Sequence, residues 1–191
     1  QVDPAHRRLR RIFNNSDFGQ GGRLYGGFWQ AMSSEERQEH ILIESDCCVE
    51  LDYGQMSLLL LYARAQAQDH VPSGDLYDLS EYGFPTESRP GIKKVIQAII
   101  NSPELPRRLP KGSRKHIPSR ISLRDILRAV ERKHPAIYPQ MTSGIGMQLF
   151  RKESDILVDV LITLRSKGIV ALPVHDAVIV MEEHKQTTIT I

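Results

Sequence analysis

The most constraining feature of this sequence is an apolar run near its end that two adjacent polar residues interrupt. Residues 169–181 read I-V-A-L-P-V-H-D-A-V-I-V-M, so short stretches rich in valine and isoleucine flank His175 and Asp176. Two such stretches around a polar dipeptide predict a β-hairpin with an acidic tip. The fold must therefore contain a sheet that includes this hairpin.

A second pair of strands is expected over residues 41–51, where I-L-I-E-S-D-C-C-V-E-L divides around the polar turn 44–46. The second of these strands delivers Asp52 at its end. The first thirty residues are punctuated by glycines, which favours loops and short strands over one long helix.

Helices are predicted between these strand pairs. Nothing breaks a helix over residues 55–68, and a helix over 92–101 is stopped by Pro103. A capping-box pattern at Ser122 precedes a helix with one apolar and one basic side, and a long helix over 145–167 ends before a glycine. Helices between separated strand pairs indicate an α+β fold, with helices on one face of an antiparallel sheet.

Four prolines between residues 103 and 118 predict an extended basic linker, which is a candidate boundary between subdomains and a candidate mobile arm. The two cysteines, Cys47 and Cys48, are adjacent, which suits neither a structural disulfide nor a zinc site. Residues 56–61 form the longest apolar run, far shorter than a membrane span, and no signal peptide opens the chain. We expect a cytoplasmic protein with no membrane partner.

The net charge of +2 hides a strong asymmetry along the chain. Residues 107–133 contain ten lysines and arginines against two acidic residues, and four more arginines lie within residues 7–11. Because neutralising phosphates releases condensed counterions, such clusters suit a polyanionic partner, and we expect Arg124, Arg128 and Arg132 to bind nucleic acid. The same pattern also fits a solvated charged surface.

Asp52 and Asp176 are the candidate metal ligands, because each follows an apolar strand. Carboxylates at neighbouring strand ends offer the hard oxygen ligands that a pair of Mg²⁺ ions needs for phosphoryl or nucleotidyl transfer. Either aspartate alone is more often a turn former or a helix cap.

Five segments resemble, in the same order, motifs of the family A polymerases of the DNA polymerase I type. Residues 52–56 (D-Y-G-Q-M) resemble the first catalytic motif D-Y-S-Q-I, and residues 174–177 (V-H-D-A) resemble the later V-H-D-E. The other three are G-R-L at 22–24 followed by W-Q at 29–30, R-x-x-x-K at 89–93, and E-S-D-I-L at 153–157. The resemblance implies a palm-like antiparallel sheet backed by helices, with a helical, fingers-like insertion.

The same resemblance implies a template-directed nucleotidyltransferase that uses two Mg²⁺ ions, with Mn²⁺ as a substitute. Asp52 and Asp176 would be catalytic and would hold both metals, and the carbonyl of Tyr53 would add a ligand. Lys93 would meet the incoming triphosphate and protonate the leaving pyrophosphate, with Arg89 beside it. Alone, these last two residues also fit a solvated helix face.

Further roles follow from the resemblance for residues that would contact nucleic acid. Arg23 matches the arginine that reaches the primer end through the minor groove, Gln30 lies in the adjoining nucleic-acid-binding segment, and His175 would support the primer terminus. By default Arg23 is a surface residue and His175 a half-buried turn histidine.

Three departures from the family pattern have functional consequences. Gln97, a candidate substrate contact, and Asn101 replace aromatic residues that stack on the new base pair. Ser57 replaces a glutamate that excludes the ribose 2′-hydroxyl, so we expect weak discrimination between dNTPs and NTPs, unless Ser57 only caps or packs its helix. Ala177 replaces the second hairpin carboxylate.

The expected organisation is one reduced module, with palm segments at 1–82 and 135–191 around a basic, fingers-like segment at 83–134. Its partners would be a DNA primer-template and nucleoside triphosphates, with room for an accessory protein or a separate thumb domain, inside a bacterial or phage-infected cell. Two alternatives remain open. One is a catalytically degenerate palm that binds nucleic acid, and the other is an Mg²⁺-dependent nuclease.

Overall fold

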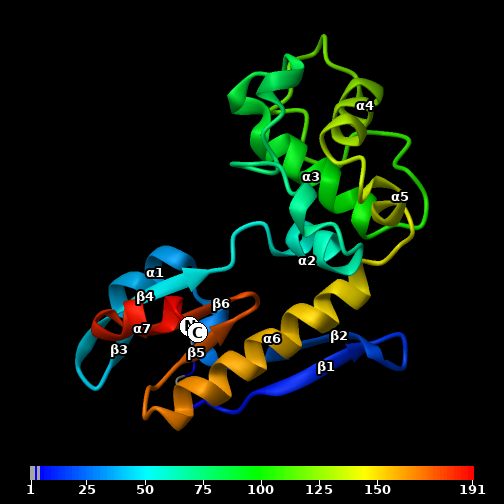
Figure 1. Ribbon diagram of the computed structural model, residues 1–191. Helices are drawn as coiled ribbons and strands as arrows, with labels where there is room; N and C mark the ends of the chain where they lie inside the picture. The colour runs from blue at the N-terminus through cyan, green and yellow to red at the C-terminus, as the bar shows by residue number, and fades with distance from the viewer. Residues whose placement is uncertain (1–2, 4) are drawn as a thin grey trace. The chain divides into compact units, whose positions relative to one another are not determined.

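The computed structural model describes residues 3 and 5–191, and the chain divides into two compact units (Figure 1). Unit 1 comprises Gln1–Gly54 and Phe150–Ile191, and unit 2 comprises Gln55–Leu149. Across the described residues, the chain forms seven α-helices and two antiparallel sheets. The predicted α+β class is therefore confirmed.

The larger sheet belongs to unit 1 and has the strand order β3-β4-β6-β5. Its strands are β3 (Leu42–Ile43), β4 (Asp46–Asp52), β5 (Leu172–Val174) and β6 (Ala177–Met181). Both predicted hairpins are present, β3–β4 and β5–β6. Glu44 and Ser45 both have positive φ, which matches the primed turns that suit the twist of a two-residue hairpin.

Strand β6 is buried along its whole length because both faces of the sheet are covered. Val178 and Val180 pack against Leu157, Val160 and Leu164 of the long helix α6 (Gly146–Ser166). The alternate residues of β6 face a second core, whose members include Trp29, Ile43, Ile179 and Met181. The sheet is thus covered on both faces, whereas the sequence predicted helices on one face.

A second, two-stranded sheet in unit 1 pairs β1 (Arg10–Asn14) with β2 (Asp17–Tyr25). It lies along α6 (Figure 1), where the Arg11 guanidinium donates to Asp155 Oδ1 at 2.9 Å. Unit 1 also contains the 3-10 helices η1 (Phe28–Ala31) and η5 (Glu182–His184), and the helices α1 (Ser34–His40) and α7 (Lys185–Ile189). Ser33 and Glu36 form a capping box at the start of α1.

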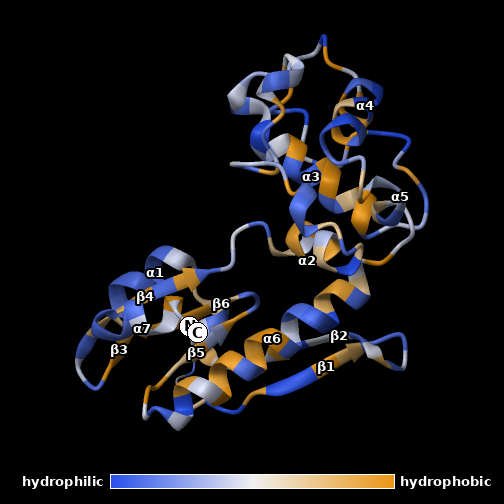
Figure 2. Ribbon diagram, viewed as in Figure 1, coloured by the Kyte–Doolittle hydropathy of each residue, from blue (hydrophilic) through white to orange (hydrophobic). Residues whose placement is uncertain are grey.

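Unit 2 is helical and has its own hydrophobic core. Its α-helices are α2 (Met56–Arg64), α3 (Arg89–Ile100), α4 (Leu123–Lys133) and α5 (Tyr138–Met141). The 3-10 helices η2 (Gln68–His70), η3 (Ser80–Tyr82) and η4 (Thr86–Ser88) connect α2 to α3. Figure 2 shows apolar residues gathered on α3, whose Val95, Ile96 and Ile99 are fully buried.

Two of these helices illustrate how well local signals work. The capping box of Ser122 and Asp125 opens α4 as predicted, and Ile126 and Val130 are buried. Helix α2 is shorter than predicted, because Gln66 adopts a left-handed conformation with φ of 53° shortly after the helix ends.

The proline-rich basic linker does not separate the two units, contrary to the expected boundary. Ile117 within it is 3% exposed and belongs to the core of unit 2. A Cβ on Gly91 would lie 2.7 Å from Cγ1 of Ile117, so only glycine lets α3 and the linker approach this closely. The division at residues 54/55 and 149/150 differs from the expected 82/83 and 134/135, because Leu58 and Leu61 of α2 share a core with α3 and α4.

Within the described residues, no helix combines the length and the apolar character that crossing a bilayer requires.

Candidate functional site

The two candidate metal ligands lie at one end of the sheet in unit 1. Asp52 is the last residue of β4 and pairs in register with Ala177, the first residue of β6. Asp176 directly precedes Ala177 in the turn that joins β5 to β6, where Val174 pairs with Ala177. Antiparallel register therefore brings together two aspartates that are far apart in sequence, as their positions at strand ends predicted.

A third carboxylate lies next to this pair and was not singled out from the sequence. Glu153 of α6 is 2% exposed, and its Oε1 accepts a hydrogen bond from Arg23 Nε at 2.8 Å and forms an ion pair with Arg23 Nη2 at 2.5 Å. The Arg23 guanidinium also stacks on the Phe150 ring, 4.1 Å from its centroid. Arg23 is thus held in place by α6 rather than free at the surface.

The pKa of Glu153 reflects both its ion pair with Arg23 and the nearby aspartates. Burial raises the pKa of Glu153, Arg23 opposes that rise, and the negative charges of Asp176 and Asp52 add to it. Glu153 therefore lies within electrostatic range of both aspartates. The Arg23 cation is the group that offsets the charge of the buried Glu153 carboxylate.

His175 occupies the hairpin tip in a strained conformation. Its φ of 55° lies in the left-handed region, which costs a non-glycine residue about 1 kcal/mol or more. Its ring packs edge-on against Tyr25, with centroids 5.9 Å apart, and its buried Nδ1 atom has no hydrogen-bond partner among the residues that the structure describes. Burial and the Arg23 cation lower the pKa of His175 against the opposing effect of Asp176.

The donor set fits Mg²⁺ in an open site. This ion is commonly held by one or two protein carboxylates and keeps water and substrate oxygens in its other positions. Glu153 is already paired with Arg23, so Asp52 and Asp176 are the carboxylates that would hold the ion. Across residues 3 and 5–191, no group of three or more His, Cys, Asp or Glu side chains is arranged to enclose a metal ion.

Asp52 and Tyr53 also line a hollow of about 520 Å³ in unit 1. Its other walls are largely apolar and come from α6, β6 and residues 188–191. Tyr53 is half-buried, and burial raises the pKa of its hydroxyl. Its side chain packs with the core around α6, which leaves only its backbone carbonyl as the expected metal ligand.

The candidate triphosphate residues lie together in unit 2. A hollow of about 500 Å³ on α3 is lined by Arg89, Pro90, Lys93, Lys94, Gln97, Pro110 and Lys111. Four of these residues are cationic, of which Lys94 was not identified from the sequence and Lys111 was expected only as part of the basic segment 107–133. The hollow suits a small polyanion, because guanidinium and ammonium groups neutralise phosphate oxygens.

Arg89 and Lys93 are held around a single tyrosine. Both cations lie over the Tyr77 ring, each 5.6 Å from its centroid. Arg89 forms an ion pair with Asp75, and although burial raises the pKa of that carboxyl, its hydrogen bonds to Arg89 and to the Tyr77 N–H lower it overall. Gln97 donates to the Tyr77 hydroxyl at 3.2 Å, which orients its amide along α3.

Two predicted site residues have structural roles instead. The Gln30 amide donates to the carbonyls of Leu24 and Pro173 and accepts from the N–H groups of Gly26 and Gly27, which uses its full hydrogen-bonding capacity. Gln30 therefore joins β2 to β5 and has no group left for nucleic acid. Ser57 is 8% exposed at the second residue of α2, which favours a packing role over contact with a ribose.

Helix α4 has the exposed basic side that the sequence predicted. Arg124, Arg128 and Arg132 are exposed and four residues apart, so they follow one side of the helix. Arg132 lies over the Tyr82 ring, 5.4 Å from its centroid. The arrangement is compatible with binding to a nucleic-acid backbone and does not by itself identify a ligand.

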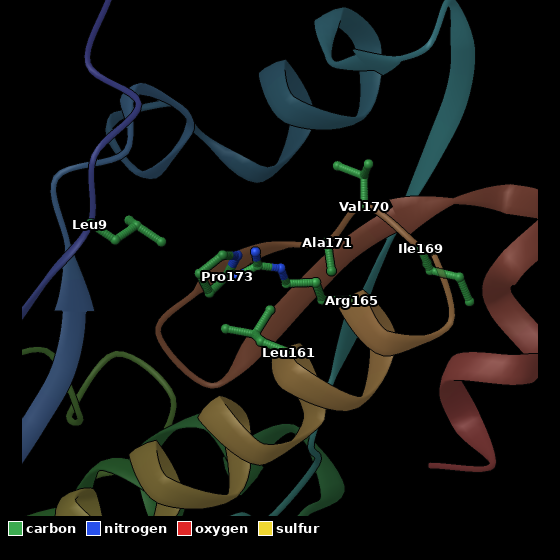
Figure 3. Close-up of a pocket in the computed structure, with 8 residues that line it drawn as sticks. Leu9, Leu161, Arg165, Ile169, Val170, Ala171 and Pro173 are labelled. Atoms are coloured by element: carbon green, nitrogen blue, oxygen red, sulfur yellow. The ribbon is translucent and has the colours of Figure 1, made fainter.

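An apolar hollow in unit 1 is unrelated to this chemistry (Figure 3). Its volume is about 390 Å³, and Arg165 is its one ionisable lining residue among the described part of the chain. The labelled apolar walls are Leu9, Leu161, Ile169, Val170, Ala171 and Pro173. Without a carboxylate or a second cation, it offers neither a metal site nor a phosphate site.

Sequence reasoning did not identify Asp75 or Lys94, included Lys111 only in the basic segment 107–133, and included Glu153 only in the E-S-D-I-L segment, without a role for its carboxylate. Glu153 carries a faint signal, since a glutamate on the apolar stripe of a long helix requires a buried partner. The others become visible only when loop and helix are folded together. Comparison of the chain with protein-family models, with curated proteins and with solved structures found no match.

Proposed function

We propose that this chain is a divalent-metal-dependent nucleotidyltransferase that extends the primer strand of a nucleic acid as directed by a template. The observation that carries the proposal is the register of β4 against β6, which sets Asp52 beside Asp176 at one end of the sheet. Side chains fixed by paired strands keep their separation without ordering cost when ligands arrive. Two neighbouring carboxylates repel a phosphate, so a metal cation between them and a nucleotide substrate would offset that repulsion.

Asp52 and Asp176 would hold Mg²⁺, with the Tyr53 carbonyl as an additional ligand, and the bound ions would supply charge neutralisation at the transferring phosphoryl group. The residues around them have roles of their own. Arg23, fixed by Glu153 and Phe150, offsets the charge of the buried carboxylate nearest to the two aspartates. The His175–Tyr25 contact fixes the hairpin tip that carries Asp176.

Unit 2 would bind the nucleoside triphosphate. The hollow on α3 brings Arg89, Lys93, Lys94 and Lys111 to one site, which matches the several negative charges of a triphosphate. Lys93 carries a proton that it would donate to the departing pyrophosphate oxygen. Most of the rate enhancement would come from positioning the substrate and neutralising its charge, and these fixed cations would contribute to both.

Primer extension tests this proposal directly. Wild-type protein is incubated with Mg²⁺, a labelled primer-template, and dNTPs or NTPs in parallel. Asp52→Asn and Asp176→Asn should each reduce extension by at least about 100-fold. Asp46→Asn is the matched control, because Asp46 is an exposed aspartate at the opposite end of β4.

Two other results would each reject nucleotidyl transfer. Retention of labelled DNA without extension, at equal strength in all variants, would identify a nucleic-acid-binding module built on the same fold. Shortening of an end-labelled DNA that depends on Asp52 and Asp176 would identify a nuclease.

A further inference from the structure

We propose that a basic hollow at the start of unit 1 binds the phosphate backbone of a nucleic-acid strand. The hollow has a volume of about 350 Å³ and is lined by Ala5, His6, Arg7, Arg8, Arg10 and Gly26. The arginines at 7–11 stood out in the sequence, and nothing in the proposed chemistry uses the ones that line this hollow. The inference rests on the proposed function only in assigning the bound strand to the one being extended.

The hollow is built by defined backbone contacts. The Phe28 N–H donates to the His6 carbonyl at 2.8 Å, which fixes His6 against the segment after β2. Gly26 has φ of +117°, and a Cβ there would lie 2.6 Å from the Arg8 carbonyl oxygen. Only glycine permits this approach, so the backbone that carries the arginines is held against the end of β2.

Arg8 and Arg10 supply the unused charge. Both side chains are exposed, and within the described residues neither has an ion-pair partner. Other arginines of unit 1 are satisfied internally: Arg11 by Asp155, Arg23 by Glu153 and Arg37 by Glu50. The contrast separates arginines that hold the fold together from arginines that face solvent around a hollow.

The position of the hollow indicates a strand rather than a free nucleotide. Arg10 pairs in register with Tyr25, and the Tyr25 ring contacts His175, the neighbour of Asp176. Cations, an aromatic ring and the carboxylate pair therefore follow one another along unit 1. A linear polyanion with its end at Asp176 would reach the hollow within a few nucleotides, and its repeated phosphates match separated arginines.

The test measures binding without any catalytic step. A fluorescein-labelled single-stranded 12-nucleotide DNA is titrated with the full chain in EDTA at several salt concentrations, using fluorescence anisotropy. The variant Arg8→Ala/Arg10→Ala should weaken binding about tenfold at 0.1 M salt and reduce the slope of log K against log salt by about 1.4. Lys152→Ala/Lys167→Ala, which removes two other exposed cations of unit 1, is the charge-matched control and should change both far less.

A second titration distinguishes a strand from a free nucleotide as the source of phosphate. Affinity for a nucleoside triphosphate should be the same in wild type and in the arginine variant. Equal loss of DNA and nucleotide binding would assign the hollow to a mononucleotide and overturn the proposal. The proposal would also be overturned if the arginine variant and the lysine control showed the same slope of log K against log salt for DNA binding.

The outcome is separable from that of the proposed function. Binding is measured in EDTA and involves no catalytic step, so the arginine effect is measurable even if extension is never seen. Where extension occurs, the arginine variant should raise KM for the primer and leave KM for the nucleotide unchanged. The reverse pattern would contradict a strand site.

Discussion

The two units bury polar groups in different ways. Unit 1 buries an ion pair, Arg23 with Glu153, beside the aspartates of the candidate site. Unit 2 buries a neutral pair, in which the Tyr62 hydroxyl donates to His134 Nδ1 at 2.9 Å, while His134 Nε2 donates to the Leu76 carbonyl at 2.9 Å. Unit 1 thus buries charged groups near the site where charged substrates are proposed to react. Unit 2 buries uncharged polar groups within its hydrophobic core.

This difference has an energetic basis. A buried ion pair roughly offsets its own desolvation, so it adds little stability, yet the loss of one partner is costly. A buried neutral hydrogen bond contributes modestly and tolerates no charge. The two units should therefore respond differently to mutation and to pH.

The largest effect is expected when the ion pair of unit 1 is broken. Glu153→Ala leaves the Arg23 guanidinium without its carboxylate and should destabilise unit 1 by about 3–5 kcal/mol. Trp29, the single tryptophan, lies in a core of unit 1, so its fluorescence during urea unfolding reports this change. Asp159→Asn, at an exposed site on the same helix, is the control. An unchanged urea midpoint would mean that the pair carries no such cost.

The next effect comes from placing a charge in the neutral pair of unit 2. Burial lowers the pKa of His134 from 6.5 to about 4. Between these values the unfolded chain binds a proton at His134 and the folded chain does not, so stability is complete above pH 6.5 and falls as pH drops toward 4. The loss should reach about 3 kcal/mol.

Hydrogen exchange of unit 2 amides at pH 4 to 7 would measure this loss. His134→Gln should remove most of that pH dependence, while the exposed site variant His70→Gln should retain it. A pH dependence that survives in His134→Gln would assign acid sensitivity to other groups.

A smaller effect is expected when the neutral pair loses its hydroxyl. Tyr62→Phe leaves His134 Nδ1 buried without a donor, which should cost about 1–3 kcal/mol in the free energy of unfolding. Tyr138→Phe, at a half-buried tyrosine of the same unit, is the comparison. Urea unfolding, monitored by circular dichroism, would compare the free energies of unfolding of the two variants. Equal losses would mean that the Tyr62–His134 hydrogen bond does not contribute more than an ordinary tyrosine hydroxyl.

The smallest effect on stability is expected at the exposed arginines of α4. Arg124→Ala/Arg128→Ala/Arg132→Ala should change the free energy of unfolding by less than about 1 kcal/mol, since exposed charges contribute little. It should nevertheless reduce the salt slope for duplex DNA binding by up to about 2.7. A slope equal to that of wild type would show that this surface is only solvated.

The elements predicted correctly from the sequence are those with local signals. The capping box at Ser122, the turn at 44–46 and the His175–Asp176 dipeptide each depend on neighbours within a few residues. Asp52 and Asp176 were placed near each other because strand ends in one antiparallel sheet meet at an edge. The register of β4 against β6 then places Asp52 opposite Ala177, the residue that follows Asp176.

The features that the sequence did not predict depend on distant contacts. Arg23 and Glu153 are 130 residues apart, and neither is unusual until β2 lies along α6. Gln30 was expected at nucleic acid, yet its amide is used by Pro173, 143 residues away. The linker at 103–118 looked like a boundary because prolines disfavour regular structure, but Ile117 within it is buried in a core.

The discontinuity of unit 1 also sets an order of events during synthesis. Residues 55–149 form a contiguous unit with its own core, so they can fold as soon as they leave the ribosome. Strand β4 by then carries Asp52 without its neighbour β6, which is synthesised after unit 2. The aspartate pair therefore forms only after unit 2 has been made, and a chain that stops at residue 149 would contain the folded basic hollow of α3 but no assembled carboxylate site.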